Sequence, residues 1–584
     1  MSTASTKSRN RKQKRKTETP ESRTKAAAAP PATQESPPRE LSVRTWTICS
    51  ISILALAAIL RIYHLSLVPL HHDEGVNGNF LVRLVRDGFY HYDPENYHGP
   101  TLYYFTAIIS WILRFFLGES AQNTYGLNTV TIRLVPALFG IATIWLVLLL
   151  RRHIGTVGSL CAAALLAVSP GAVYLSRYFI HETLFVFFTL AVVVAVLNFY
   201  EDGHPVYLVL ASASAALLFA TKETFIINLP VLLLALVSTK LYQWMRLGFR
   251  REQKPSKYNR GRSDTYRERL EDRISYLGGS TRLLILGSLA LAVFVIVSVL
   301  FYSSFFTNFP KGVYDSLKTF AVWTQTGQKA HVHPYWKYIE WLTLQEGALL
   351  FLGVIGAVFT LWQPRKSFAL FAAFWAFGTL AAYSLVPYKT PWLTLNLIVP
   401  LALVAGSVFQ TLYHHDGKHA LGVILVFMGL AIALGTYQAI DLNFFNYDND
   451  RRTVDLSSIV PEYRPQYYVY VYAHTRREML PLVDEIDRIA KASGEGNRIG
   501  ITIVSPDYWP LPWYLRDYKR AGYHGTMTTS NEPIIIAKEE QQPEVQAMFG
   551  DRYMQINSGF NEAGSYALRP SVDLLLYVRK DVPH

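Results

Sequence analysis

Long apolar runs occupy most of the chain up to about residue 440. Twelve of them stand out: 45–66, 101–117, 129–150, 158–175, 183–200, 206–220, 224–243, 282–302, 347–362, 367–386, 391–411 and 419–440. Most of these runs approach the ~20 residues that a helix needs to cross ~30 Å of hydrocarbon. The pattern predicts an α-helical integral membrane protein that crosses the bilayer many times.

Composition agrees with a bilayer environment. Of the 584 residues, 51% are hydrophobic and only 17% are charged, whereas soluble domains carry about 25% charged residues. The net charge of +13 would suggest nucleic-acid binding. The basic residues, however, lie in an N-terminal tail and between apolar runs, so membrane topology explains them better and we expect no nucleic-acid partner. Cys49 and Cys161 both lie inside apolar runs, which excludes a disulfide framework.

Basic residues also predict the topology. Four segments are clearly basic: the N-terminal tail, Arg151-Arg152, the loop from Arg246 to Arg282, and Arg365-Lys366. Cytoplasmic loops carry an excess of Lys and Arg, and all four segments fall on one side only if residues 101–117 do not cross. We therefore expect 101–117 to be a juxtamembrane helix on the outer surface. About eleven spans remain, which makes a multi-pass cell-membrane protein with a cytoplasmic N-terminus.

The remaining segments suggest three parts. Residues 1–44 are rich in Lys, Arg, Ser, Ala and Pro and predict a disordered basic cytoplasmic tail. The membrane domain, 45–440, would include an outer loop at 67–128 and a basic cytoplasmic loop at 244–281. Residues 441–584 predict a small extracytoplasmic α/β domain with a partly parallel sheet. Its expected elements are strands at 466–472, 498–504, 533–537 and 572–578 and a helix at 476–492.

This topology places every notable polar cluster on the outer side. The clusters are His71-His72-Asp73-Glu74, Tyr97-His98-Gly99-Pro100-Thr101, Ser176-Arg177 with His181-Glu182, Lys222-Glu223, and Tyr388-Lys389-Thr390-Pro391-Trp392. Each has a plain structural explanation as well: a hydrated acid pair, a helix start, ion pairs that anchor a turn at the interface, or a snorkelling lysine. Their common side favours a functional site over five unrelated features.

The first cluster also raises the possibility of a metal. Two histidines beside Asp73 and Glu74 are suitable ligands for a divalent cation. A further well-placed ligand is not evident in the sequence. A divalent metal is therefore possible but not favoured, and we expect no cofactor.

Cations and a carboxylate pair around one outer face suit one reaction in particular. Glycosyl transfer from a lipid-linked phosphosugar has a phosphate leaving group, which needs no general acid, unlike the two-carboxylate chemistry of glycosidases. It needs cations to take up developing charge and a carboxylate to accept the proton of the attacking hydroxyl. Arg177, Lys222 and Lys389 would serve the first purpose, and Asp73 with Glu74 the second.

Several motifs resemble those of GT-C membrane glycosyltransferases. They are Asp73-Glu74 after the first span, His98-Gly99-Pro100, Arg133-Leu134-Val135-Pro136, Ser176-Arg177 followed by an acid at Glu182, and Lys389-Thr390-Pro391-Trp392 through Pro400. The similar subgroup contains protein O-mannosyltransferases and lipid A aminoarabinose transferases of the family 39 type. The resemblance implies a GT-C fold over residues 45–440 and a polyprenyl-phosphate-linked sugar as the donor.

A narrower resemblance covers His72 through Tyr104 and Trp509-Pro510-Leu511-Pro512-Trp513-Tyr514. These stretches are similar to an archaeal and bacterial membrane-protein family that is named for its association with flippase activity in surface glycosylation. Together the resemblances imply a glycosyltransferase at the outer face of the membrane, active on a protein, lipid or surface glycan that the sequence does not identify.

The two resemblances also suggest roles for residues. Asp73 and Glu74 would be catalytic, and His98, Arg177, Glu182, Lys222 and Lys389 would bind substrate. Two alternatives stay open. The protein would otherwise be a transport component for flipping lipid-linked sugars, or a non-catalytic scaffold that has kept the fold.

Overall fold

Helices account for most of the described chain. The computed structural model describes residues 40–96, 98–118, 124–248, 274–326, 331–448, 468–557 and 563–584. Residues 1–39 of the expected tail lie outside these ranges. Residues 249–273, which make up most of the expected basic loop, also lie outside them. Within the described residues, nine helices are long and apolar enough to span a membrane. The protein is therefore a multi-pass membrane protein, as its sequence predicted.

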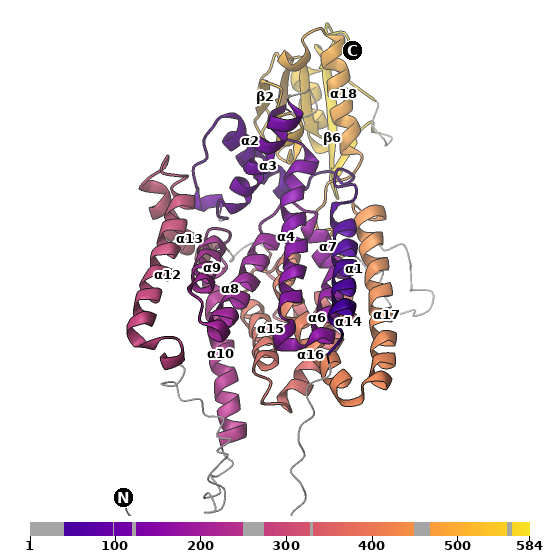
Figure 1. The fold of residues 1–584 in the computed structure, drawn as a ribbon. Helices are drawn as coiled ribbons and strands as arrows, with labels where there is room; N and C mark the ends of the chain where they lie inside the picture. The colour runs from indigo at the N-terminus through magenta and orange to yellow at the C-terminus, as the bar shows by residue number, and fades with distance from the viewer. Residues whose placement is uncertain are drawn as a thin grey trace, which may run out of the picture. The chain divides into compact units, whose positions relative to one another are not determined.

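The spanning helices follow the predicted runs closely (Figure 1). They are α1 (Val43–Ile62), α4 (Thr129–Leu149), α8 (Glu182–Asp202), α10 (Phe225–Gly248), α12 (Gly279–Tyr302), α14 (Lys337–Leu361), α15 (Ser367–Leu385), α16 (Leu395–Asp416) and α17 (Lys418–Ile440). Helix α16 lies at the centre, with 94% of its apolar window buried, whereas only 11% of the corresponding window in α12 is buried. Apolar side chains along α12 consequently face the lipid.

Two of the eleven expected spans differ from simple crossing helices. One is a bent pair, α6 (Thr156–Val168) and α7 (Pro170–Ser176), whose axes differ by 62°. The other is α9 (Pro205–Phe219), which is too short to meet the length criterion by itself. The described residues thus contain nine or ten spans by this criterion, compared with the predicted eleven.

A buried carboxylate holds the break between α6 and α7. Pro170 cannot donate a backbone hydrogen bond and restricts the residue before it, which ends α6. Glu346 of α14 accepts hydrogen bonds from Ser169 Oγ at 2.9 Å and from Gly171 N at 2.8 Å. The carboxylate thus satisfies the polar groups at the start of α7.

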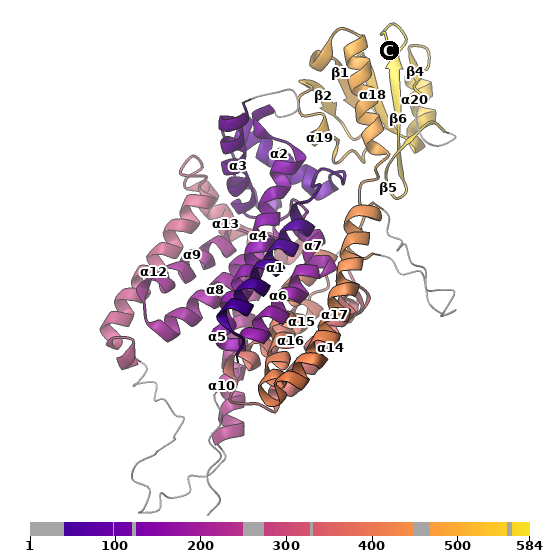
Figure 2. The same ribbon diagram turned by 45° about the vertical axis from the view of Figure 1, so that its right-hand side comes forward.

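The described parts of the basic segments gather at one end of the helix bundle. Arg282 Nη2 donates to the carbonyl of Gly203 at 3.3 Å, and Gln243 Nε2 donates to the carbonyl of Pro364 at 2.8 Å. These contacts join the described edges of the loop around 249–273 to the turns near 203 and 364. The polar clusters lie at the other end, together with the C-terminal domain (Figures 1 and 2). Which end faces the cytoplasm stays a prediction from the positive-inside rule.

The segment between α1 and α4 carries two further helices at the end of the bundle that bears the polar clusters. They are α2 (His72–Arg86), which follows the first span directly, and α3 (Thr101–Leu117), which begins after Pro100 and coincides with the expected juxtamembrane helix. Phe115 and Phe116 at the end of α3 are 83% and 75% exposed. Aromatic side chains of this kind are typical of a membrane interface, and the position of α3 on the outer surface stays a prediction.

The C-terminal domain is a mixed sheet with helices, as predicted. Its elements are α18 (Met479–Ala492), β1 (Gly500–Ile503), α19 (Leu511–Tyr514), β2 (Arg520–Tyr523), β3 (Ile534–Lys538), α20 (Gln542–Phe549), β4 (Tyr553–Gln555), β5 (Tyr566–Arg569) and β6 (Val572–Arg579). The order is β2-β1-β3-β6-β4, with β5 paired to β6. Strands β1, β2 and β3 are parallel, while β6 is antiparallel to β3.

The strand expected at 466–472 is wrong for its described residues, 468–472, which form turns. Tyr468 and Tyr470 are buried against the membrane domain, and the Tyr468 hydroxyl donates to Asp441 Oδ2 at 2.5 Å. Tyr470 is 3.2 Å from Thr394 Oγ1 of the membrane domain. The alternating aromatic pattern therefore reflects packing of a linker onto the bundle and not a place in the sheet.

The C-terminal domain packs directly on α2. A methyl group added at Gly75 would lie 2.6 Å from Pro510 Cβ, and one added at Gly78 would lie 2.6 Å from Trp513 Cε3. Leu70 N donates to the Tyr514 hydroxyl at 2.9 Å. The two glycines of α2 thus allow the Trp509–Tyr514 segment to approach the helix backbone.

This contact predicts the effect of Gly75→Ala. Real Cβ atoms do not tolerate separations of this size, and Pro510 Cα would lie only 2.8 Å away, so the packed segment must shift. We expect a loss of about 1–3 kcal/mol, as for other overpacked sites, seen as a lower apparent melting temperature in detergent. Gly422→Ala is a matched control in α17, where the new methyl meets nothing within 4 Å. Equal melting temperatures for the two variants would contradict the close packing.

Candidate functional site

The start of α2 places the two acids of the first cluster in opposite surroundings. His71 caps the helix: its Nδ1 accepts a hydrogen bond from the backbone N of Asp73 at 3.1 Å. Glu74 Oε2 in turn accepts one from His71 N at 3.0 Å, which completes a capping box. Because successive helical residues point about 100° apart, fixing Glu74 inward directs Asp73 to a different side.

Glu74 is fully buried in a charged contact with Arg133 of α4. Arg133 Nε and Nη2 donate to the two carboxylate oxygens at 2.7 and 2.6 Å. Phe179 N donates to Oε1 at 2.8 Å. This bidentate pair satisfies the carboxylate, and Glu74 is not among the residues that line the cavity described below. The structure thus places Glu74 in a buried ion pair away from the cavity, and the catalytic role expected for it stays a prediction.

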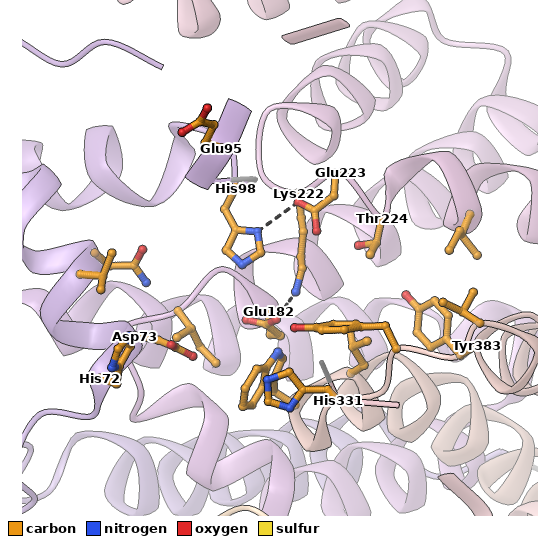
Figure 3. A pocket seen from close by; sticks show the side chains of 18 of the residues that line it. His72, Asp73, Glu95, His98, Glu182, Lys222, Glu223, Thr224, His331 and Tyr383 are labelled. Carbon is orange, nitrogen blue, oxygen red and sulfur yellow. Dashed lines mark hydrogen bonds and ion pairs between the residues drawn. The ribbon is translucent and has the colours of Figure 1, made fainter. Parts of the chain in front are cut away.

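Asp73 opens onto a cavity of about 380 Å³ at the same end of the bundle (Figure 3). Its side chain is 39% exposed and lies 3.9 Å from His71 Nδ1. The charged and polar lining comes from segments far apart in the sequence: His72, Asp73, Asn77, Glu95, His98, Glu182, Lys222, Glu223, Thr224 and His331. Tyr103, Tyr338, Tyr383, Tyr388 and Trp392 form much of the aromatic lining.

Two ion pairs lie among the residues that line this cavity. Lys222 Nζ donates to Glu182 Oε1, and His98 Nδ1 lies 3.0 Å from Glu223 Oε2. Figure 3 shows both pairs side by side. Burial alone would raise the pKa of Glu223, but the charge and hydrogen bond of His98, together with Lys222, lower it below the ordinary value. Glu223 is thus ionised at neutral pH.

His181 helps to hold His98 in place. The two rings are 4.9 Å apart, and His181 Nε2 donates to the carbonyl of Gly99 at 3.0 Å. Burial, with the neighbouring charges of His98 and Lys222, lowers the pKa of His181 well below its ordinary value. The ring is therefore neutral at pH 7 and fixes the turn that carries His98.

Two cations that the sequence assigned to a phosphate clamp lie elsewhere. Arg177 caps the end of α1: its guanidinium donates to the carbonyls of Tyr63 at 2.7 Å and His64 at 3.1 Å. Burial and the charge of Arg133 lower the pKa of Arg177 to about 9. Lys389 is 1% exposed, and its Nζ donates to the carbonyls of Val386 at 2.5 Å and His333 at 3.3 Å.

Four of the seven sequence-derived site residues therefore meet in the cavity: Asp73, His98, Glu182 and Lys222. Glu74, Arg177 and Lys389 satisfy buried carboxylate or carbonyl groups instead. Glu95, Tyr338 and Tyr383 also line the cavity but were not predicted from the sequence. Glu95 stands in a polar loop close to His98, which is a usable signal, but the two tyrosines belong to apolar runs and carry none.

The described residues contain no group of three or more His, Cys, Asp or Glu side chains that could hold a metal ion. Two cavity carboxylates, Glu182 and Glu223, are engaged by Lys222 and His98 respectively. Among the described residues, two of the four cavity acids are thus arranged in ion pairs.

Comparisons with known proteins were made at the levels of sequence and fold. Residues 103–248 match the family model described as dolichyl-phosphate-mannose-protein mannosyltransferase. No curated protein sequence matches the chain. Among solved structures, ArnT from Cupriavidus metallidurans in the apo state is 13% identical, with a TM-score of 0.55 over 92% of this chain and 98% of that chain.

Two further structures are similar to this chain. ArnT bound to undecaprenyl phosphate gives a TM-score of 0.54 at 13% identity, over 92% of this chain and 98% of that one. The apo Archaeoglobus fulgidus oligosaccharyltransferase gives 0.48 at 14% identity, over 82% and 64%. The ArnT comparisons confirm the GT-C resemblance at the level of the fold. The narrower resemblance to the flippase-associated family stays a prediction.

The Glu74–Arg133 contact predicts how the acid pair divides its roles. Glu74→Gln leaves the guanidinium of Arg133 buried without its counter-charge, and breaking one side of a buried ion pair costs about 3–5 kcal/mol. We expect a clear fall in the apparent melting temperature and in the yield of folded protein. Asp73→Asn, one position away and partly exposed, is the matched control. A stable Glu74→Gln variant would show that the pair is not structural.

Proposed function

We propose that the protein is a membrane glycosyltransferase that moves a sugar from a polyprenyl-phosphate-linked donor to an acceptor hydroxyl at the outer face. The observation that carries the proposal is the partly exposed carboxylate of Asp73, which opens onto a cavity at the ends of the spanning helices. The shared fold with ArnT supports it, because that protein has been solved with undecaprenyl phosphate.

The chemistry requires few groups. The acceptor oxygen attacks the anomeric carbon of the donor sugar while the bond from that carbon to the phosphate oxygen breaks. The pair of electrons leaves with polyprenyl phosphate, whose low basicity makes a general acid unnecessary. The acceptor proton passes to a carboxylate. Asp73 is the best-placed acid because, unlike Glu182 and Glu223, it forms no short ion pair with a described residue of the cavity.

The cations at this site differ from the three that the sequence suggested. Lys222 and His98 line the cavity, each beside a carboxylate. An incoming lipid phosphate would compete with Glu182 for Lys222. The positive charge of Lys222 would then stabilise the negative charge that develops on the leaving phosphate. We do not assign Arg177 or Lys389 to the phosphate, because both are turned towards backbone carbonyls.

The decisive test is Asp73→Asn. The amide preserves shape but cannot accept the proton, and losing a general base typically lowers the rate ~10²–10⁴-fold. Donor affinity should change little, because Lys222 and His98 remain. The measurement is transfer from labelled polyprenyl-phosphate sugars at saturating donor, in membranes with matched protein levels.

Glu95→Gln is the control, since Glu95 is an exposed acid of the same cavity. We expect it to retain most of the activity. A parent rate for Asp73→Asn would assign the base elsewhere. A parent protein that binds such lipids but transfers no sugar would favour the transport role in flipping lipid-linked sugars.

We also propose that the cavity and the C-terminal domain face outwards and the basic end faces the cytoplasm, so that the domain positions the acceptor or a partner. The Lys/Arg asymmetry supports this orientation. In a background without Cys49 and Cys161, a cysteine at Glu540 should react with an impermeant thiol reagent in intact cells. A cysteine at Asp416, at the basic end, should react only after the membrane is opened. The reverse pattern would overturn the orientation.

A further inference from the structure

Three side chains that carry hydroxyl groups line one end of the cavity. Thr224 stands just before α10, Tyr338 lies at the start of α14, and Tyr383 lies near the end of α15; all three side chains are buried and line the cavity. The two tyrosine rings are 6.1 Å apart. Figure 3 shows Thr224 and Tyr383 on the side of the cavity away from Asp73.

None of these three hydroxyls forms a hydrogen bond within the described chain. Thr224 and Tyr383 are near neighbours. Tyr338 lies near the backbone of Thr390, yet neither contact meets hydrogen-bond geometry. Buried polar groups in proteins are nearly always paired, and each exception calls for an explanation. An unpaired hydroxyl costs folding free energy, so three of them around one cavity indicate groups reserved for a ligand.

The charges nearby decide which part of a ligand belongs here. Glu182 and Glu223 both act electrostatically on Tyr383. Each of these carboxylates is paired with a cation that we assign to the phosphate, Lys222 or His98, whereas the three hydroxyls are neutral and offer a phosphate group no counter-charge. A neutral ring with several hydroxyls therefore fits this end better than the anionic part of a lipid donor.

We infer that Thr224, Tyr338 and Tyr383 form the subsite that recognises the hydroxyls of the donor sugar. The inference rests on the proposed function, which it deepens by assigning a neutral, polyhydroxylated sugar. Each hydroxyl can donate and accept, which suits sugar hydroxyl groups. Aromatic walls with a few placed polar groups are typical of small-molecule sites.

The subsite also explains selectivity. A site built to pair with a hydroxyl rejects an analogue that lacks it, because the buried partner is then left unpaired. The protein should bind a polyprenyl-phosphate hexose more tightly than bare polyprenyl phosphate. The difference between the two lipids measures the sugar subsite separately from the phosphate contacts.

The experiment compares Tyr338→Phe and Tyr383→Phe with the parent protein. The probes are polyprenyl-phosphate glucose, mannose and N-acetylglucosamine, with polyprenyl phosphate as the reference, and binding is measured on the purified full-length protein. Losing one hydrogen bond to the sugar should weaken binding of the preferred glycosylated lipid about 3- to 10-fold. Binding of polyprenyl phosphate should not change.

The stability of the same variants is a second measurement. Here the change is expected to be neutral or favourable, whereas the affinity for the glycosylated lipid should fall. Removing an unpaired buried hydroxyl should leave the apparent melting temperature of the ligand-free protein unchanged or raise it. Tyr577→Phe is the matched control: Tyr577 is also buried with an unpaired hydroxyl, but it lies in β6 of the C-terminal domain. We expect Tyr577→Phe to show no change in affinity for any of the four lipids.

The outcomes separate the two ideas. If the parent binds a glycosylated lipid more tightly than polyprenyl phosphate and both cavity variants bind it equally well, the subsite is overturned while the proposed function stands. If the parent binds none of the four lipids, the proposed function fails and the subsite with it. A selective loss of affinity for the glycosylated lipid, with unchanged stability, supports the subsite.

Discussion

The buried contact between Glu74 and Arg133 is the constraint on which the rest of the site depends. It joins α2 to α4 within the bundle, and Arg133 also donates to the carbonyls of Leu65, Val68 and Pro69. One guanidinium thereby fixes both the end of the loop after α1 and the first turn of α2. With Glu74 held inward and His71 capping the helix, the direction of Asp73 is determined.

Other buried cations have a similar role. Each lies where backbone carbonyls or carboxylates would otherwise lack a hydrogen-bond donor. Arg177 covers the carbonyls at the end of α1, and Lys389 those of a turn. Of the described basic residues that the sequence assigned to the site, Lys222 and His98 remain there, and their partners are carboxylates that line the cavity. In a membrane protein, where water is scarce near helix ends, satisfying such groups competes directly with function for each basic side chain.

The spans and the position of the site could be predicted from the sequence alone, but the directions of the side chains could not. Spans were predictable because the hydrophobic pattern is local, and so was the end of the bundle at which Asp73, His98, Glu182 and Lys222 meet. The direction of each side chain was not predictable, which is why Glu74, Arg177 and Lys389 were assigned to the site. Tyr468 and Tyr470 alternate as strand residues do, but they are buried on the membrane domain, and a pattern of period two does not identify the partner.

Helix α2 belongs to two structural units at once. One of its faces carries Asp73 beside the cavity, and its glycines receive the proline and tryptophan side chains of the C-terminal segment. A chimera that exchanges the C-terminal domain at the linker would therefore cut across a closely packed contact, however natural that boundary looks in the sequence. Domain exchange between homologues should succeed only when α2 travels with the domain that packs on it, and the two segments are expected to diverge together in evolution.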